Sequence, residues 1–351
     1  LLSGFQNTPH RVLNAEQAIQ EIPDLKQAGL KGAGVYYDAV MDDVKLTLEV
    51  IYDGILNKKS HAINYAELNE FENIGDINKL SLTDCLTHEK KEITTNHTVM
   101  ALGPFADKFL HSQKNIPWTD QLIPSKGSHI WIEKSTLNIK YPMVLNTIDG
   151  RIIFVIPRQD AILVGTTELE TVEEYFDIKP SEAEINYLLK SLNEYFPQKN
   201  IQKKHILSSF SGIRPLVQEE TGQIGNLKKT SRIHHNYQPF SNLHIILGGK
   251  YTTFRVMGQD ISRSIVQSFN KVFNSSMTKK KLRQKSIIQS FSSVKAELTS
   301  ADIENIISNE YVRTYQDLLE RRIGIRNAGQ WIYQKSLKQL LEEVPKELTK
   351  D

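Results

Sequence analysis

The residues of this chain that could do chemistry stand next to glycines in short hydrophobic segments. His129 follows Lys126-Gly127-Ser128, and the alternation after Gly127 predicts Ser128 and Ile130 on one face of a strand and His129 on the other. A histidine placed in this way can accept a proton near neutral pH. Lone histidines are more often structural, so the segment alone leaves both interpretations open.

Arg214 is the second residue of this kind. It stands in Ser211-Gly212-Ile213-Arg214-Pro215, where glycine and proline fix the course of the backbone. An arginine on a fixed backbone suits bidentate recognition of a phosphate or a carboxylate. The alternative is a structural arginine that pairs with an acid of the core.

The third segment is a strand, two glycines and a helix over residues 243–255, with Gly248-Gly249-Lys250 at its centre. Two glycines let a backbone come close to a bulky ligand, and a helix N-terminus favours negative charge. Lys250 adds a full positive charge. A reduced flavin, which is negative around N1 and the C2 carbonyl, would be stabilised there. The alternative is a plain strand-to-helix turn.

Three further segments carry weaker signals. Gly165-Thr166-Thr167-Glu168 and Ala101-Leu102-Gly103-Pro104-Phe105 are consistent with turn chemistry alone. His234-His235 has no partner at a metal-ligand spacing, so we interpret it as a surface loop and predict no metal site.

The composition of the chain limits the classes of protein to which it can belong. The chain has 351 residues, 39% of them hydrophobic and 24% charged, which is ordinary for a globular protein of two or three domains. A formal charge of +2 gives no indication of nucleic-acid binding. Cys85 is the only cysteine, which excludes an internal disulfide and fits a reducing, cytoplasmic compartment.

The membrane signals are weak. There is no run of about 18 apolar residues, so we predict no spanning helix. Lys279-Lys280-Lys281 could contact anionic lipid peripherally, although a charge run is usually a solvated face. The chain starts at Leu1 without an initiator Met, and we expect it to be a fragment of a longer protein.

Periodicity and capping residues predict the elements that would position these side chains. Asn14 and Ser181 are predicted helix N-caps, the latter with Glu184 at the capping-box position. The expected helices lie within 1–32 and at 42–57, 181–195, 252–269 and from 277 to the end, and a polar hairpin or loop is expected at 73–95. The expected strands are 62–68, 98–101, 126–132, 143–146, 151–156, 161–165, 205–210 and 243–247.

Taken in order, these segments resemble the FAD-dependent glycerol-3-phosphate dehydrogenases, which belong to the D-amino-acid-oxidase-like flavoproteins. Spacing agrees over residues 11–265, and the match is looser at 310–322. The matching segments are Tyr36-Tyr37-Asp38 with Met41-Asp42-Asp43, Ala101-Leu102-Gly103-Pro104, Lys126-Gly127-Ser128-His129, residues 151–157, Gly165-Thr166-Thr167-Glu168, Ser211-Gly212-Ile213-Arg214-Pro215-Leu216 and residues 248–255.

The chain departs from the family pattern in three ways. No G-x-G-x-x-G occurs, and the early arginine-containing segment of the substrate pocket is also missing. The family's Asn-Ala-Thr-Gly-Pro stretch reads Met100-Ala101-Leu102-Gly103-Pro104. The change removes two polar side chains next to the cofactor, while Gly103 keeps the close backbone approach.

The resemblance implies a mixed α/β fold in which a discontinuous, Rossmann-like FAD-binding domain lacks its first βαβ unit. Residues 1–118 and 241–275 would form this domain. A mixed, largely antiparallel substrate domain would occupy 119–240, and a helical C-terminal domain 276–351.

The resemblance also implies oxidation of glycerol 3-phosphate at C2 to dihydroxyacetone phosphate, with hydride passing to flavin N5 and electrons to a quinone, or to oxygen in related oxidases. Arg214 and Lys250 would neutralise the phosphate or the developing alkoxide, His129 would accept the hydroxyl proton and Thr253 would contact the substrate. The residues expected at the flavin are Gly103, Pro104, Arg232, Gly248, Gly249, Lys250, Thr252 and Thr253.

Peripheral membrane contact and a homodimer are compatible with this interpretation. Two alternatives stay open: another FAD-dependent oxidoreductase of amino or hydroxy acids, and a non-catalytic remnant that lacks the ADP-binding segment.

Overall fold

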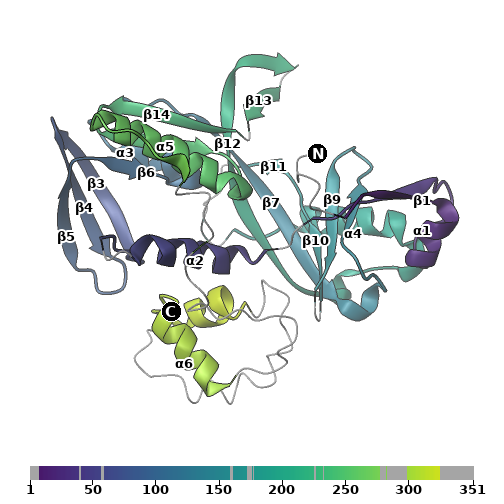
Figure 1. The fold of residues 1–351 in the computed structure, drawn as a ribbon. Coiled ribbons are helices and arrows are strands. Elements are labelled where there is room, and N and C mark those ends of the chain that lie inside the picture. The colour runs from purple at the N-terminus through teal and green to yellow at the C-terminus, as the bar shows by residue number, and fades with distance from the viewer. Residues whose placement is uncertain are drawn as a thin grey trace.

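The computed structural model describes residues 8–38, 41–56, 59–158, 161–171, 176, 178–224, 227–231, 233–276, 282 and 299–324. Its largest element is a seven-stranded sheet in the order β13-β12-β7-β10-β9-β8, with β11 paired to β7 (Figure 1). All pairings in this sheet are antiparallel, whereas the expected sheet over 119–240 was mixed and only largely antiparallel. The strands are β7 (Leu122–Glu133), β8 (Met143–Asn146), β9 (Ile152–Pro157), β10 (Ala161–Gly165), β11 (Leu169–Glu170), β12 (Ile206–Ile224) and β13 (Leu227–Ser231).

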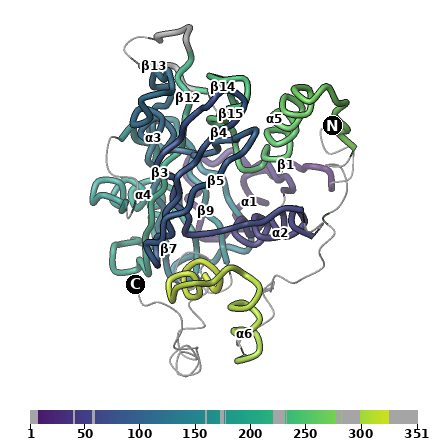
Figure 2. The backbone as a smooth tube through the Cα atoms, turned by 90° about the vertical axis from the view of Figure 1, so that its left-hand side faces the viewer, coloured from purple at the N-terminus to yellow at the C-terminus, as the bar shows by residue number. Residues whose placement is uncertain are grey.

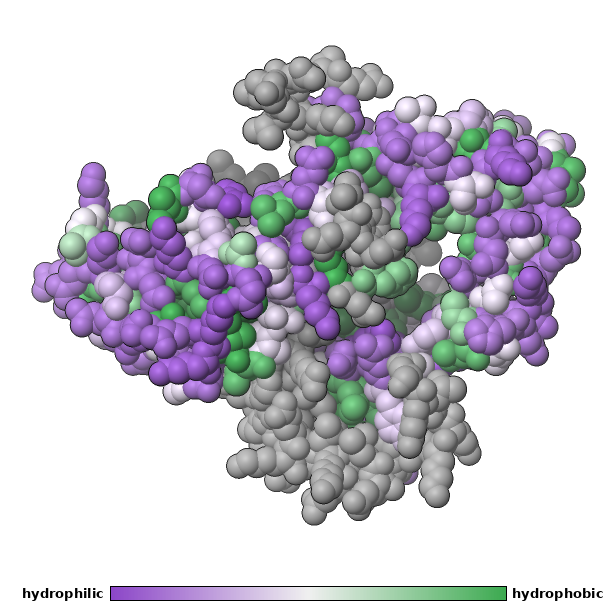
Figure 3. Space-filling view, turned by 180° about the vertical axis from the view of Figure 1, so that it is seen from behind, coloured by the Kyte–Doolittle hydropathy of each residue, from purple (hydrophilic) through white to green (hydrophobic). Residues whose placement is uncertain are grey.

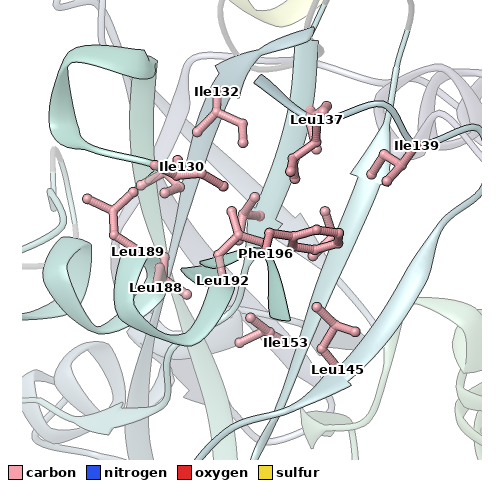
Figure 4. Packing of buried hydrophobic residues seen from close by; sticks show 14 of the residues in the cluster. Ile130, Ile132, Leu137, Ile139, Leu145, Ile153, Leu188, Leu189, Leu192 and Phe196 are labelled. Atoms are coloured by element: carbon pink, nitrogen blue, oxygen red, sulfur yellow. The ribbon is translucent and has the colours of Figure 1, made fainter. Parts of the chain in front are cut away.

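Helix α4 (Glu182–Tyr195) covers one face of this sheet and forms the main hydrophobic core with it. Ser181 caps the helix and Glu184 completes the capping box, as the sequence predicts. Figure 4 shows side chains of α4 and of the segment after it directed at the strands. The fully buried members are Ile130, Ile132, Ile153, Val155, Ile162, Val164, Leu188, Leu192 and Phe196.

A second sheet joins segments that lie far apart in the chain. Strand β15 (Leu243–Gly248) lies between β14 (His234–Phe240), to which it is antiparallel, and β6 (Thr98–Met100), to which it is parallel. Helix α5 (Phe254–Ser268) follows β15 and lies along this sheet in Figure 1. The pairing of β6 with β15 fits the expected discontinuous domain.

The third sheet is antiparallel and contains β3 (Ala66–Ile74), β4 (Ile77–Asp84) and β5 (Lys90–Thr95). It therefore confirms a hairpin within 73–95. Asn78 joins it to the second sheet, because its Nδ2 donates to Thr98 Oγ1 at 3.1 Å and to the Asn242 carbonyl at 2.9 Å.

The two ends of the described chain have different secondary structure. At the N-terminal end, β1 (Arg11–Asn14) pairs with β2 (Gly32–Val35) in antiparallel fashion. The short helix α1 (Ala15–Glu21) lies between them in the sequence. The helix expected within 1–32 is present as α1 and is capped by Asn14 as predicted, but the two strands on either side of it were not expected. The two strands escaped prediction because each has only four residues.

The C-terminal part that the structure describes consists of α6 (Ser300–Asn309) and a π-helix (Asp317–Arg322). Both Figure 1 and Figure 2 show it beneath α2 (Asp43–Ile55). The buried Lys45 of α2 donates to Glu310 at 2.6 Å, which fixes the two parts together. The Lys279-Lys280-Lys281 run and the helix expected beyond residue 324 lie outside the described residues.

Gly103–Phe105 forms the 3₁₀ turn η1, consistent with its Gly and Pro, and it is followed by helix α3 (Ala106–Ser112), which was not expected. One local prediction fails. His234-His235 is not a surface loop but the start of β14, and His234 Nε2 lies 2.9 Å from Asp260 of α5. Figure 3 shows the rear face, on which hydrophobic residues form small groups among hydrophilic ones.

Candidate functional site

The pairing of β7 with β12 brings two of the predicted residues together. In this antiparallel register His129 is opposite Phe210, Gly127 is opposite Gly212, and Arg214 is opposite Ser125. Opposed residues point to the same side of a sheet, and so do residues two apart along one strand. His129 and Arg214 therefore share one face, and α4 covers the other.

Arg214 lies flat against the strand beside it. A Cβ placed on Gly127 would come within 2.3 Å of both Nη atoms of Arg214, so the guanidinium occupies the space above this glycine. Arg214 Nη2 donates to Thr166 Oγ1 at 2.8 Å, and Nη1 lies 3.4 Å from the Thr167 carbonyl oxygen. The loop after β10 thus orients the guanidinium from one side.

His129 is held in a similar way by a glycine and a ring. Its imidazole stacks on Phe210 with centroids 4.9 Å apart and an interplanar angle of 8°. On the other side, a Cβ on Gly165 would come within 2.2 Å of its Cδ2. The ring is thereby wedged between two strands, and its orientation is fixed by packing.

The environment of His129 favours the neutral imidazole. Burial lowers its pKa to about 4, and the positive charge of Arg214 acts in the same direction. The buried Nδ1 has no hydrogen-bond partner among the described residues. The histidine is therefore unprotonated near neutral pH, as a proton acceptor must be.

A buried polar cluster lies under the same strands on the α4 side. Glu184 accepts hydrogen bonds from Ser128 Oγ at 2.5 Å and from Thr167 Oγ1 at 2.8 Å. Lys126 Nζ lies 3.2 Å from the other carboxylate oxygen. Sequence reasoning missed this cluster, because Glu184 reads as a helix cap and nothing local links it to Thr167.

The parallel strands β6 and β15 place the glycine segments side by side. Met100 is the register partner of Ile245, and Gly103 and Gly248 each follow three residues later. Both glycines have left-handed backbones, with φ of 56° and 71°. The carboxyl ends of parallel strands, where these glycines lie, are where ligands bind in open α/β sheets.

The two glycine segments differ in the space around them. No atom lies within 4 Å of a Cβ built on Gly103. A Cβ on Gly248 would lie 2.8 Å from Val217 Cγ2, and one on Gly249 would lie 2.6 Å from Met257 Sδ. Gly248 and Gly249 therefore have a packing reason in addition to the predicted cofactor role, whereas the Gly103 backbone is open.

Lys250 and Thr253 form the turn that follows. Lys250 N lies 3.2 Å from Thr253 Oγ1, which in turn donates to the Lys250 carbonyl at 2.9 Å. The turn η5 (Tyr251–Thr253) precedes α5, so the helix starts two residues after the predicted Thr252. Lys250 itself is exposed.

The predicted residues thus form two groups that meet at β12. His129 and Arg214 lie on the β7–β12 face. Gly103 with Pro104, and Gly248 through Thr253, lie at the ends of β6 and β15, and both η1 and β15 contact β12. Arg232, the remaining cofactor candidate, lies outside the described residues.

Two cavities, metal-ligand groupings and membrane spans are the remaining features of the described residues that bear on a site. Cavities of about 310 Å³ beside Trp118 and about 370 Å³ between α2 and Tyr311 lie away from His129 and Arg214. Within the described ranges, no three His, Cys, Asp or Glu side chains gather as metal ligands would. The helices described there are too short or too polar to cross a bilayer.

The chain is similar in sequence to proteins of known family. Residues 3–254 match the family described as FAD dependent oxidoreductase. The aerobic glycerol-3-phosphate dehydrogenase of Bacillus subtilis (strain 168) is 31% identical over 263 residues, which are 74% of this chain and 46% of that protein. The alpha-glycerophosphate oxidase of Streptococcus pneumoniae serotype 4 is 33% identical over 225 residues, covering 62% and 36% of the two chains.

Among solved structures, the glycerol-3-phosphate dehydrogenase of Bacillus halodurans complexed with FAD superposes with a TM-score of 0.68 at 26% identity. The match covers 76% of this chain and 51% of that one. The chain therefore spans about half the length, or less, of the relatives it matches. Over most of its length, the chain belongs to the FAD dependent oxidoreductase family.

Proposed function

We propose that the protein containing this chain oxidises glycerol 3-phosphate at C2 to dihydroxyacetone phosphate with FAD and passes the electrons to a quinone. The observation that carries the proposal is the pair of Arg214 and His129 on one face of β7 and β12. The pair combines an oriented cation with a neutral proton acceptor. The names of the similar dehydrogenases and oxidase support the choice of substrate.

Arg214 is the proposed phosphate ligand. The bond from Nη2 to Thr166 Oγ1 and the contact with Gly127 fix the plane of its guanidinium. A guanidinium held in this way can bind two phosphate oxygens at a small cost in side-chain entropy. Lys250, exposed at the end of β15, would add charge to the phosphate or to the developing alkoxide, and Thr253 of the same turn would contact the substrate.

His129 is the proposed base for the C2 hydroxyl. The low pKa of His129 keeps the imidazole free to accept this proton. Because the charge of Arg214 contributes to the low pKa, a phosphate bound to Arg214 would raise the pKa of His129. The hydroxyl proton then goes to His129, the C2 hydrogen leaves with its electron pair, and the C–O bond becomes a carbonyl.

The backbone at the ends of β6 and β15 fits FAD. Gly103 has a left-handed backbone with open space around it, so a flat ring can approach it closely. Gly103 and Pro104 on one side, and Gly248, Gly249, Lys250, Thr252 and Thr253 on the other, would hold the cofactor. FAD, when bound there, supplies the two-electron acceptor. Met100-Ala101-Leu102 offers no polar side chain for this purpose, so the backbone would make the contacts.

The domain limits follow from the same assignment. The pairing of β6 with β15 supports a cofactor domain built from residues 1–118 and 241–275. The seven-stranded sheet with α4 supports a substrate domain over 119–240, and α6 supports a helical C-terminal domain within 276–351.

The acceptor and the location are also part of the proposal. A dehydrogenase would pass its electrons to a quinone, as the resemblance implies, and similarity to an alpha-glycerophosphate oxidase makes oxygen the alternative. A quinone acceptor implies peripheral contact with the inner face of the membrane. A cytoplasmic site of action agrees with the single, unpaired Cys85. A homodimer is compatible with these assignments.

An anaerobic absorbance experiment on the full-length protein tests the substrate. Glycerol 3-phosphate should bleach the flavin band, and glycerol, lactate and proline should leave it unchanged at equal concentration. Bleaching by lactate or proline alone would replace the proposal with an amino- or hydroxy-acid oxidoreductase. Purified full-length protein that carries no flavin would favour a non-catalytic remnant.

A further inference from the structure

Glu184 lies on the face of the sheet opposite Arg214, yet it contacts the segments that orient Arg214. We propose that Glu184 is a positioning residue that sets the affinity of Arg214 for an anion by holding the Thr166–Thr167 loop against β7. The proposal deepens the proposed function, because it concerns the phosphate-binding half of the same site. It assigns to a helix-capping residue a role that its local sequence does not show.

The two carboxylate oxygens of Glu184 accept hydrogen bonds from different parts of the structure. Oε2 accepts hydrogen bonds from the backbone N and the Oγ of Ser181, each at 2.9 Å, and these bonds cap α4. Oε1 accepts from Ser128 Oγ at 2.5 Å and from Thr167 Oγ1 at 2.8 Å. Oε2 therefore caps α4 and also contacts Lys126 of β7, whereas Oε1 connects β7 with the loop after β10.

Thr167 connects Glu184 on one face of the sheet with Arg214 on the other. Its Oγ1 donates to Glu184 and accepts from the backbone N of Ser128 at 2.9 Å. The carbonyl of the same residue lies 3.4 Å from Arg214 Nη1, and the preceding Thr166 accepts from Nη2 at 2.8 Å. The two oxygens that orient the guanidinium are thus close in sequence to the group that contacts Glu184. The carbonyl oxygen belongs to Thr167, whose Oγ1 is hydrogen-bonded to Glu184, and the hydroxyl oxygen belongs to the preceding Thr166.

Ser128 gives a second connection to the site. It lies between Gly127, above which the guanidinium rests, and His129. Its Oγ also lies 2.7 Å from Ser211 Oγ of β12, three residues before Arg214. The carboxylate therefore fixes the strand under the guanidinium as well as the loop beside it.

The cluster requires an ionised carboxylate. Burial acts to raise the pKa of Glu184, but the hydrogen bonds from Ser128, Ser181 and Thr167 outweigh it and lower the pKa to about 2. Lys126, 4% exposed, lies 3.2 Å from Oε2 and balances the charge. A glutamine at this position has one acceptor oxygen in place of two, so it cannot accept from both Ser181 and the Ser128–Thr167 pair.

If Glu184 only capped α4, its loss would affect stability and not anion binding. Three variants distinguish this capping role from the proposed positioning role. Ser181→Ala removes the N-cap hydroxyl and leaves the bonds from Ser128 and Thr167 to Oε1 in place. Thr167→Val removes the connection to the loop and leaves the cap in place. Glu184→Gln disturbs both.

The test measures anion binding by full-length protein with each substitution, using calorimetric titration with inorganic phosphate and anaerobic flavin reduction by glycerol 3-phosphate. Glu184→Gln and Thr167→Val should each raise the dissociation constants for phosphate and for glycerol 3-phosphate about tenfold. The limiting rate of flavin reduction should change less than about threefold. Ser181→Ala should lower the thermal midpoint and leave both constants within about twofold. The Glu184→Gln/Thr167→Val double variant should weaken binding by less than the product of the single effects, because both act through one contact.

Unchanged phosphate binding in Thr167→Val would overturn the positioning role, as would an equal loss in Ser181→Ala. If glycerol 3-phosphate fails to reduce the unsubstituted protein, the proposed function fails, and the phosphate titration still decides the role of Glu184. If Glu184→Gln does not fold, Thr167→Val and Ser181→Ala decide it together.

Discussion

The guanidinium of Arg214 lies directly above Gly127, and a single added methyl group on Gly127 would come within 2.3 Å of both terminal nitrogens. Gly127 is therefore required by the side chain that rests on it. Gly165 has the same relationship to His129, whose ring lies where a Cβ would be. The two proposed substrate-contacting residues are thus seated on two glycines of neighbouring strands.

Replacing Gly127 with alanine should displace Arg214 from this seat. We expect Gly127→Ala to raise the dissociation constant for glycerol 3-phosphate at least about tenfold, because the guanidinium loses its oriented position. The matched control is Gly212→Ala, since Gly212 is opposite Gly127 and has no atom within 4 Å of its Cβ position. The control should stay within about twofold. Equal binding in the two variants would show that the contact has no effect on affinity.

The pKa of His129 makes folding stability depend on pH. Its value of about 4 in the folded protein lies below the ordinary 6.5, so the unfolded chain takes up a proton first as the pH falls. The stabilisation is complete above pH 6.5 and decreases by up to about 3 kcal/mol between pH 6.5 and 4.

We expect the thermal midpoint of His129→Gln to depend less on pH in this window than that of the unsubstituted protein. The control is His111→Gln, because the His111 side chain is 62% exposed. Some dependence should remain in His129→Gln, because burial also lowers the pKa of His244. An identical pH dependence in His129→Gln and the unsubstituted protein would mean that His129 titrates normally.

The ion pair of Lys45 and Glu310 should be the main electrostatic connection between α2 and the C-terminal part. Glu310 is fully buried, and burial lowers the pKa of Lys45 despite the adjacent carboxylate. Glu310→Gln would leave Lys45 buried beside an uncharged partner, which costs about 3 kcal/mol. Faster hydrogen exchange in residues 300–309 would reveal the loss, whereas Lys91→Met in the exposed pair with Glu89 should have no effect.

The double variant Lys45→Met/Glu310→Gln also removes the buried charge of Lys45 and should restore much of the protection. Protection that stays low in the double variant would show that the shape of the two side chains, rather than their charges, holds α6 in place.

The main core depends on Phe196, which ends α4 and is completely buried among the strands (Figure 4). Phe196→Ala should destabilise the protein by about 3–5 kcal/mol, since it leaves a cavity that rigid neighbours cannot fill. Denaturant unfolding followed by near-UV circular dichroism measures this loss. Ile148→Ala is the control, because Ile148 is 69% exposed and should change the unfolding free energy by less than about 0.5 kcal/mol.

Local signals predicted much of the fold. Helix α4 was predictable because Ser181 and Glu184 form a capping box next to a regular apolar period. Alternation also placed His129 correctly, away from Ser128 and Ile130. These features depend on residues within a few positions of each other, which a single sequence displays directly.

The contacts that build the site were not predictable, because they join distant segments. The pairing of β7 with β12 brings Arg214 to His129, but the expected second strand ended at 210 and did not include Arg214. Glu184 shows its capping role locally, whereas its bonds to Ser128 and Thr167 exist only after α4 packs on the sheet. His234 looked like a loop residue because its partner, Asp260, lies on a later helix.

Single-turnover reduction of the flavin by glycerol 3-phosphate, in full-length protein with and without Arg214→Gln, tests the central claim most directly. We expect saturable bleaching in the unsubstituted protein and a dissociation constant at least about 100-fold higher in the variant, since a charged bidentate contact is lost. Added guanidinium ion should partly restore the binding. Equal dissociation constants in the two proteins would contradict the claim that Arg214 binds the phosphate.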